Sequence, residues 1–173
     1  TLGAFRDPCT VAKYLRDDPL VLPGQPGKSH LHTFFGNAGI DAFSTQETLS
    51  TQRASTCAGG TLFATAMWVP TMIDEIGHPI TFALNSYQKG SYNFDISQTV
   101  VPIPAGLRMV VGDPKNTDPA KGAMQFSCIG PDNKSSAWQR TIPRAIADGG
   151  HCIAGGTFYA SVAFPNCWDG VNL

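Results

Sequence analysis

Turn-forming residues are the feature that most constrains how this chain can fold. Its 173 residues include 18 glycines and 13 prolines. Proline interrupts helices and central strands, and glycine supplies the backbone conformations that tight turns need. The charged fraction is only 14%, below the roughly 25% of an average globular protein. This profile favours a loop-rich fold dominated by short β-strands.

Short apolar or alternating runs mark the expected strands. They lie at residues 62–69, 80–84, 107–114, 124–128 and 157–165. The run at 107–114 is expected to be a buried strand that ends in a turn. We also expect a strand within residues 30–37, a helical turn from Thr10 and a short helix over residues 44–50. The sequence therefore predicts one mainly β domain over residues 1–173, with a sandwich or jelly-roll-like core, long loops and short helices.

Five cysteines lie far apart, without the two-residue spacing of a structural zinc site or a redox pair. They are Cys9, Cys57, Cys128, Cys152 and Cys167. Dispersed cysteines in a chain of low charge fit an oxidising, extracellular compartment. We expect two disulfides within the chain. The fifth cysteine is either a free thiol or has a partner beyond residue 173, and Cys152 and Cys167 are the candidates for this fifth cysteine.

Charge and hydropathy exclude several classes of partner. The net charge is −1 and the isoelectric point is near 6.4, so no field attracts nucleic acid or an anionic membrane. No apolar run approaches the roughly 18 residues of a membrane span. The chain begins without methionine or an apolar segment, which is consistent with a removed signal peptide. We expect a secreted, soluble monomer that carries one N-glycosylation sequon, at Asn133.

Two histidines, His30 and His32, stand between a Pro/Gly-rich lead and a Gly-Asn exit. In an extended backbone, residues i and i+2 face the same side, so both imidazoles can reach one ligand. Imidazole titrates near neutrality and is the commonest metal ligand. The pair is a candidate general acid/base, or a copper or zinc site with His151 as third ligand. Alternatively, both side chains tie the loop backbone by hydrogen bonds.

Asp169 follows Trp168 in a glycine-flanked turn. A carboxylate desolvated by an indole has a raised pKa and can serve as a general acid. Alternatively, Asp169 caps its own turn. Arg108 lies on the expected apolar strand and needs a charged partner there. Arg108 and Asn37 are candidate substrate contacts. Trp168 is a candidate sugar platform, and the other two stacking candidates are Trp68 and Trp138.

No Gly-x-Ser-x-Gly, His-Glu-x-x-His or phosphate-binding glycine loop occurs, which disfavours serine hydrolases, zincins and nucleotide-dependent enzymes. Five motifs in order carry a resemblance to a known family. They lie at residues 30–37, 55–60, 68–70, 106–113 and 164–170. From about Asp18 onward the chain resembles the DUF1996 family, secreted fungal and bacterial proteins of unassigned function, some joined to carbohydrate-binding modules. Members resemble one another again after the last motif, in a histidine-containing segment and a further cysteine. The resemblance therefore implies a sixth cysteine beyond residue 173.

Together these observations predict a secreted enzyme that cleaves extracellular or cell-wall polysaccharide, as a hydrolase or a lyase. His30 or His32 would act as base and Asp169 as acid, and no cofactor is required. The alternative is a non-catalytic protein that binds copper or zinc through His30 and His32, or a wall-associated carbohydrate-binding protein.

Overall fold

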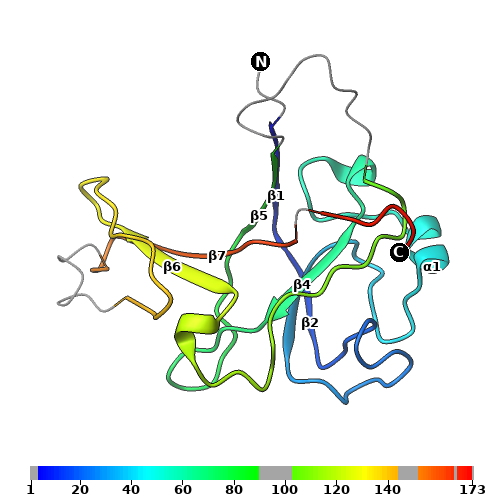
Figure 1. Cartoon of the computed structure of the whole chain (residues 1–173), viewed down its shortest axis with the longest axis horizontal. Coiled ribbons are helices and arrows are strands. Elements are labelled where there is room, and N and C mark those ends of the chain that lie inside the picture. The colour runs from blue at the N-terminus through cyan, green and yellow to red at the C-terminus, as the bar shows by residue number, and fades with distance from the viewer. Residues whose placement is uncertain (1–3, 90–102, 144–151, 166, 173) are drawn as a thin grey trace. The chain divides into compact units, whose positions relative to one another are not determined.

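The computed structural model describes residues 4–89, 103–143, 152–165 and 167–172 (Figure 1). Its strands form antiparallel sheets, and its helices are short, so the predicted mainly β class is confirmed. The chain divides into two compact units, Thr1–Gly106 and Leu107–Leu173, which are described separately. Whether the two units form one domain, as predicted, stays a prediction. In the described ranges, no helix is long and apolar enough to cross a bilayer.

The first unit contains two antiparallel sheets. Strand β1 (Ala4–Cys9) pairs with β5 (Leu84–Lys89). The second sheet has the order β2 (Val11–Leu15), β3 (His32–Gly36), β4 (Ala66–Pro70). All five residues of β3 are buried, because the sheet is covered on both faces at its central strand.

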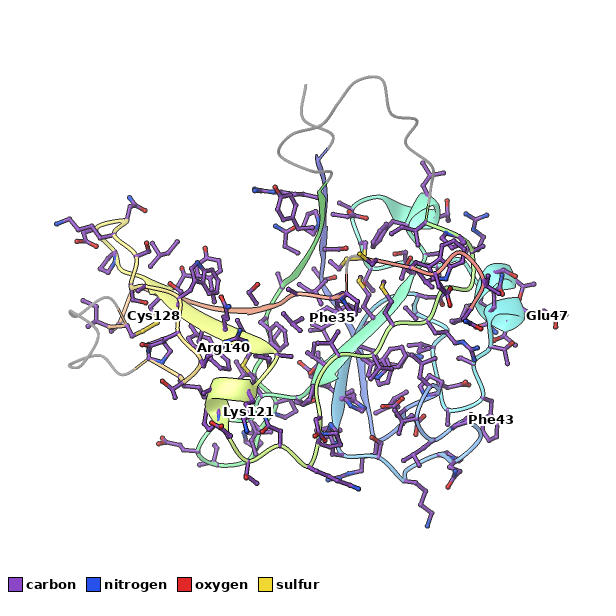
Figure 2. All side chains as sticks on the ribbon, viewed as in Figure 1. Phe35, Phe43, Glu47, Lys121, Cys128 and Arg140 are labelled. Carbon is purple, nitrogen blue, oxygen red and sulfur yellow. A yellow bond between two sulfur atoms is a disulfide. The ribbon has the colours of Figure 1, made fainter. Side chains whose placement is uncertain are left out.

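One face of β3 packs into the core of this unit. Phe35 is fully buried against Phe63 and the disulfide between Cys9 and Cys57. Figure 2 shows Phe35 in the interior and Glu47 on the outside of the unit. Partly buried residues from strands of both sheets and from the segment before β5 complete the cluster: Val11, Met67, Val69, Phe82 and Leu84. Residues of both sheets therefore contribute to one apolar core.

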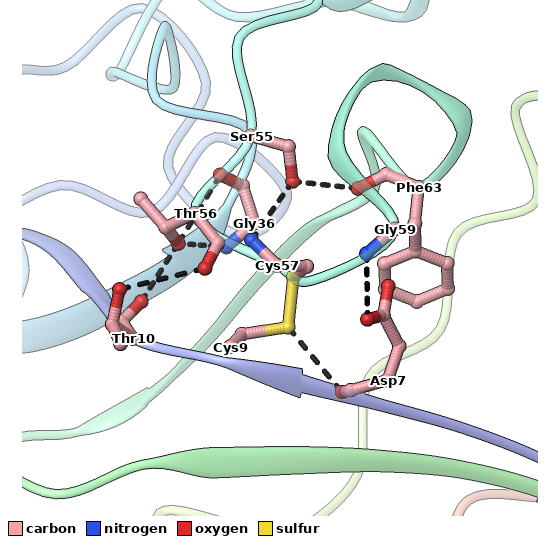
Figure 3. Close-up of a disulfide and its surroundings, with 9 residues drawn as sticks. All are labelled: Asp7, Cys9, Thr10, Gly36, Ser55, Thr56, Cys57, Gly59 and Phe63. Carbon is pink, nitrogen blue, oxygen red and sulfur yellow. Dashed lines mark hydrogen bonds between the residues drawn. A yellow bond between two sulfur atoms is a disulfide. The ribbon is translucent and has the colours of Figure 1, made fainter.

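The Cys9–Cys57 disulfide is built into a network of backbone and hydroxyl hydrogen bonds (Figure 3). The Thr56 hydroxyl donates to the Thr10 carbonyl at 2.7 Å. The buried Asp7 carboxylate accepts the Gly59 amide at 2.9 Å through Oδ1, and its Oδ2 has no partner among the described residues. The loop that contains Cys57 is thus held to β1 by both covalent and polar links.

The second unit is built on β6 (Met124–Ile129) and β7 (Thr157–Val162). On the other side of β6, the chain at residues 135–139 forms isolated bridges. The Phe126 and Phe158 rings stack across the sheet, with centroids 5.8 Å apart. Both strands were predicted from their sequence pattern.

Two disulfides form, as predicted. Cys9–Cys57 spans 48 residues and Cys128–Cys152 spans 24. In the loop-entropy model they contribute about 4 and about 3.5 kcal/mol by restricting the unfolded chain. Since Cys152 pairs within the chain, the fifth cysteine is Cys167, which lies exposed. Both disulfides are consistent with an oxidising compartment.

The helical turn predicted from Thr10 is wrong, because Val11–Leu15 forms strand β2. Here pairing with β3 decides the local conformation, and the β-branched and aromatic side chains of this segment suit a strand. The buried strand predicted at residues 107–114 is also wrong, since this run is irregular and largely exposed. Gly106 and Gly112 bracket it with φ of 89° and 108°. An apolar run does not become a strand unless another strand satisfies its backbone groups.

The remaining elements are short. Helix α1 (Gln46–Thr51) lies close to its predicted place, and the hydroxyl groups of Thr45 and Thr48 form a reciprocal capping box that we did not expect. The 3-10 turns are η1 (Gly60–Leu62) and η2 (Pro119–Lys121). Because η1 occupies the start of the strand predicted at residues 62–69, β4 begins later.

Candidate functional site

His30 and His32 lie side by side at the entry to β3. Their ring centroids are 4.2 Å apart and the ring planes are tilted by 56°. The i, i+2 spacing therefore places both rings on one face, as predicted. His30 is exposed, whereas His32 is only 3% exposed. A substrate can thus reach the first imidazole, with the second lying behind it.

A row of aromatic rings continues from the histidines along this face of the sheet. His32 meets Phe34 edge to face, with centroids 6.0 Å apart. Phe34 in turn lies 5.6 Å from Trp68, its register partner on β4. Phe34 is fully buried and Trp68 is partly buried. His32 therefore sits in largely apolar surroundings.

One hydrogen bond fixes the tautomer of His32. Its Nδ1 lies 2.8 Å from the backbone carbonyl oxygen of Asp17. A carbonyl oxygen can only accept, so Nδ1 carries the proton and Nε2 keeps its lone pair. The Ser29 hydroxyl lies 3.5 Å from the same nitrogen. The hydrogen bond to Asp17 thereby fixes the orientation of the ring.

Burial lowers the pKa of His32 below its usual value, because an imidazolium is poorly solvated there. The hydrogen bond to the Asp17 carbonyl opposes this shift, and the positive charge of His30 adds to it. The negative charge of Asp18 favours the imidazolium but is the weakest of the four effects. His32 is therefore neutral at pH 7.

Asp17 is the residue that sequence reasoning missed. Its buried carboxylate accepts the Gly27 amide at 2.9 Å through Oδ1 and the Ala42 amide at 3.1 Å through Oδ2. It therefore joins two loops while its carbonyl orients His32. The only local signal was the Asp-Asp-Pro sequence at residues 17–19.

Asn37, a predicted substrate contact, is fully buried and structural. Three backbone carbonyls lie within hydrogen-bonding distance of its Nδ2 and share its two N–H groups, and its Oδ1 accepts the Gly39 amide at 2.9 Å. The three carbonyls belong to Leu49, Gln52 and Ala64. Its hydrogen-bonding capacity is used inside the fold, and its role as a substrate contact stays a prediction.

Asp169 caps its own turn in the second unit. Its Oδ1 accepts the amides of Val171 and Asn172, each at 2.9 Å, and its Oδ2 accepts the Asn172 side-chain amide. These hydrogen bonds lower the pKa of Asp169, whose carboxylate is exposed. The shift is opposite to the raised pKa expected of a general acid, and it agrees with the alternative that we gave. The catalytic role of Asp169 stays a prediction.

Three aromatic or charged candidates are exposed in the second unit. The Trp168 indole is 45% exposed and donates through Nε1 to the Asn172 carbonyl, and Trp138 is 53% exposed. Arg108 lies exposed in a loop rather than on a buried strand, so burial does not require it to have a charged partner. Its role as a substrate contact stays a prediction.

The predicted metal ligands are placed only in part. His151 lies outside the described residues. Among the residues that the structure describes, no group of three or more histidine, cysteine, aspartate or glutamate side chains could hold a metal ion. A metal site at His30 and His32 would need at least one further ligand, and metal binding by this pair stays a prediction.

Two surface hollows lie beside the disulfides. One of about 330 Å³ is lined by residues around Cys9 and Cys57, and one of about 190 Å³ by residues around Cys128 and Cys152. Among the described residues, neither a predicted catalytic residue nor a charged residue lines either hollow. They do not extend the candidate site.

Comparison with known proteins agrees with the ordered motifs in the sequence. The family model described as a domain of unknown function, DUF1996, matches residues 18–173. The chain therefore belongs to the DUF1996 family. No significant match was found among the curated proteins or the solved structures.

The buried, neutral His32 predicts how stability depends on pH. The unfolded chain takes up a proton near the usual histidine pKa of 6.5, whereas folded His32 resists it until a lower pH. The contribution of His32 is therefore complete above about pH 6.5 and is lost as the pH falls toward the folded pKa. We expect the free energy of unfolding, measured in urea, to fall less steeply over this range in His32→Gln than in wild type. The exposed His78→Gln variant is the control, and equal slopes in all three proteins would contradict this account.

Proposed function

We propose that this member of the DUF1996 family acts on an extracellular or cell-wall polysaccharide, with His30 as the group that accepts a proton. The observation that carries the proposal is the histidine pair, an exposed imidazole resting on a buried, neutral one. The preorganised Nδ1 hydrogen bond to Asp17 holds the buried ring in place. A positioned imidazole of this kind suits general acid/base chemistry near neutral pH.

The choice of His30 over His32 follows from access. A side chain that is 3% exposed cannot meet a polymer without rearrangement, whereas His30 is exposed. A neutral His32 also does not repel the imidazolium that His30 becomes after it accepts a proton. His32 is therefore assigned a positioning role. The sequence alone did not distinguish His30 from His32 as the base.

Elimination fits this site better than hydrolysis. In hydrolysis a separate acid commonly protonates the leaving oxygen, and Asp169 with its lowered pKa does not hold a proton near neutrality. In elimination on a uronate, one imidazole can take the proton from the carbon atom next to the carboxylate. It can then give that proton to the sugar oxygen that leaves. That sequence consumes and releases one proton and needs no second carboxylic acid.

A polysaccharide substrate agrees with two further features. The indoles of Trp138 and Trp168 are exposed, and their faces can stack on sugar rings. Two disulfides suit a protein that works outside the cell. Hydroxyl-rich polymers of the cell wall are the abundant substrates in that setting.

A second candidate function is copper or zinc binding without turnover. It is favoured by the His32 hydrogen bond, because metal-ligating histidines almost always donate their other ring N–H to a carbonyl or carboxylate. His32 Nε2 and the His30 ring would supply two ligands, and a third must come from another residue, solvent or a bound molecule.

The catalytic proposal predicts product release from at least one polymer in a panel of β-glucans, chitin and uronic-acid polysaccharides. We expect His30→Gln to lower the rate by roughly 10²-fold or more, as for loss of a general base, and His78→Gln to leave it unchanged. Reducing ends report both reactions, whereas ultraviolet absorbance of an unsaturated uronate reports elimination alone. Full activity in His30→Gln, or no release from any polymer by wild type, would contradict the proposal.

The metal proposal predicts one equivalent of Cu²⁺ or Zn²⁺ bound by the untagged protein in calorimetric titration. Binding should weaken at least tenfold in His30→Gln and persist in His78→Gln, since the pair would lose one of its two imidazoles. Equal, weak binding in all three proteins would rule out this pair as a metal site, whatever the outcome of the activity assay.

A further inference from the structure

The connection after β6 is a tight turn closed by its own backbone. The Gly130 amide donates to the Lys134 carbonyl and the Asn133 amide donates to the Gly130 carbonyl, both at 2.9 Å. The Asp132 carboxylate accepts the Lys134 amide at 3.1 Å. None of these hydrogen bonds uses the side chain of Asn133.

Asn133 stands in the left-handed region of backbone space, with φ of 61°. Asparagine tolerates this conformation better than other residues with a Cβ atom. All five residues from 131 to 135 are exposed. The amide of Asn133 is therefore presented to solvent at the tip of the turn, where an attached group would meet no packed side chain.

The boundary between this exposed tip and the packed sheet falls just after the sequon. Ser135 bridges to Ile129 in the backbone register, yet it is exposed. The next residue, Ser136, is buried, and its Oγ accepts the Cys128 amide at 3.0 Å. The Ser127 hydroxyl also donates to the Ser136 carbonyl at 2.9 Å. The whole triplet at residues 133–135 thus lies outside the packed part of the sheet.

We propose that Asn133 is a site of N-linked glycosylation when the protein passes through a eukaryotic secretory pathway. The Asn133-Lys134-Ser135 triplet satisfies the acceptor rule, with a hydroxyl residue two positions on and no proline between. The donor is an oligosaccharide joined through its first carbon to a polyprenyl pyrophosphate. The Asn133 nitrogen forms a bond to that carbon and loses a proton, and the lipid pyrophosphate leaves.

The glycosylation of Asn133 does not depend on the histidine pair. It depends on the exposed turn and on passage of the chain through an oxidising compartment. Its Cys128–Cys152 neighbour is a disulfide that forms in such a compartment. An asparagine at a left-handed turn position also has a purely structural explanation. The experiment must therefore separate the conformational role of Asn133 from its modification.

The full chain should be secreted from a eukaryotic host and its mass measured before and after treatment with peptide N-glycosidase. Wild type and Ser135→Thr are expected to lose the mass of one glycan, and residue 133 to become aspartate. Ser135→Ala removes the hydroxyl residue that the acceptor triplet requires and leaves Asn133 unchanged. Asn133→Gly removes the acceptor amide and places at position 133 a residue that tolerates the left-handed φ. Both should be secreted without the glycan and with an intact Cys128–Cys152 peptide. Wild type secreted with an unmodified Asn133 peptide would overturn the proposal, and so would an unchanged glycan mass in Ser135→Ala.

Discussion

The buried carboxylate of Asp17 is the interaction on which the region around the histidines depends. It accepts amides from two loops that have no strand or helix partner at those points, those of Gly27 and Ala42. Ala42 is buried, and a buried backbone amide without a partner costs about as much as a lost hydrogen bond, so its loop needs this acceptor. The exposed Gly27 is tied to the same carboxylate. The same residue orients His32 through its carbonyl. Loop order and ring orientation are thus set by one residue.

Asn37 has the same function at the other end of β3. One fully buried amide side chain hydrogen-bonds to four backbone groups, of which one lies in α1 and three lie in loops. Such hydrogen bonds contribute on the order of 1 kcal/mol each, and removal of the side chain would take this donor away from the three carbonyls. The Cys9–Cys57 disulfide then links β1 to the loop after α1. In this turn-rich chain with small sheets, hydrogen bonds from buried side chains and disulfides therefore hold the loops in place.

Sequence predicted those parts of the structure whose cause is local. Alternation along residues 124–128 and 157–165 predicts β6 and β7, and the i, i+2 spacing predicts the adjacent rings of His30 and His32. The hydrogen bonds of Asp169 reach only three residues along the chain, so the turn-cap alternative was available from sequence.

Other features depend on contacts between distant residues and could not be predicted in this way. Asp17 lies 25 residues from Ala42, and Asn37 lies 27 from Ala64. Pairing with β3 turned Val11–Leu15 into a strand, whereas the apolar run at 107–114 found no pairing of that kind and stayed irregular. Local pattern gives candidate residues, and tertiary contacts decide which of them are buried and structural.

Native-state hydrogen exchange of the Gly27 and Ala42 amides tests the role of Asp17 most directly. Both amides should be protected in wild type, because each donates to a buried carboxylate oxygen. Asp17→Asn keeps one acceptor oxygen but places an N–H group against the other amide, so at least one of the two should exchange roughly tenfold faster or more. The Cys128 amide on β6 should be unchanged. Equal exchange of Gly27 and Ala42 in both proteins would contradict the claim that Asp17 holds these loops.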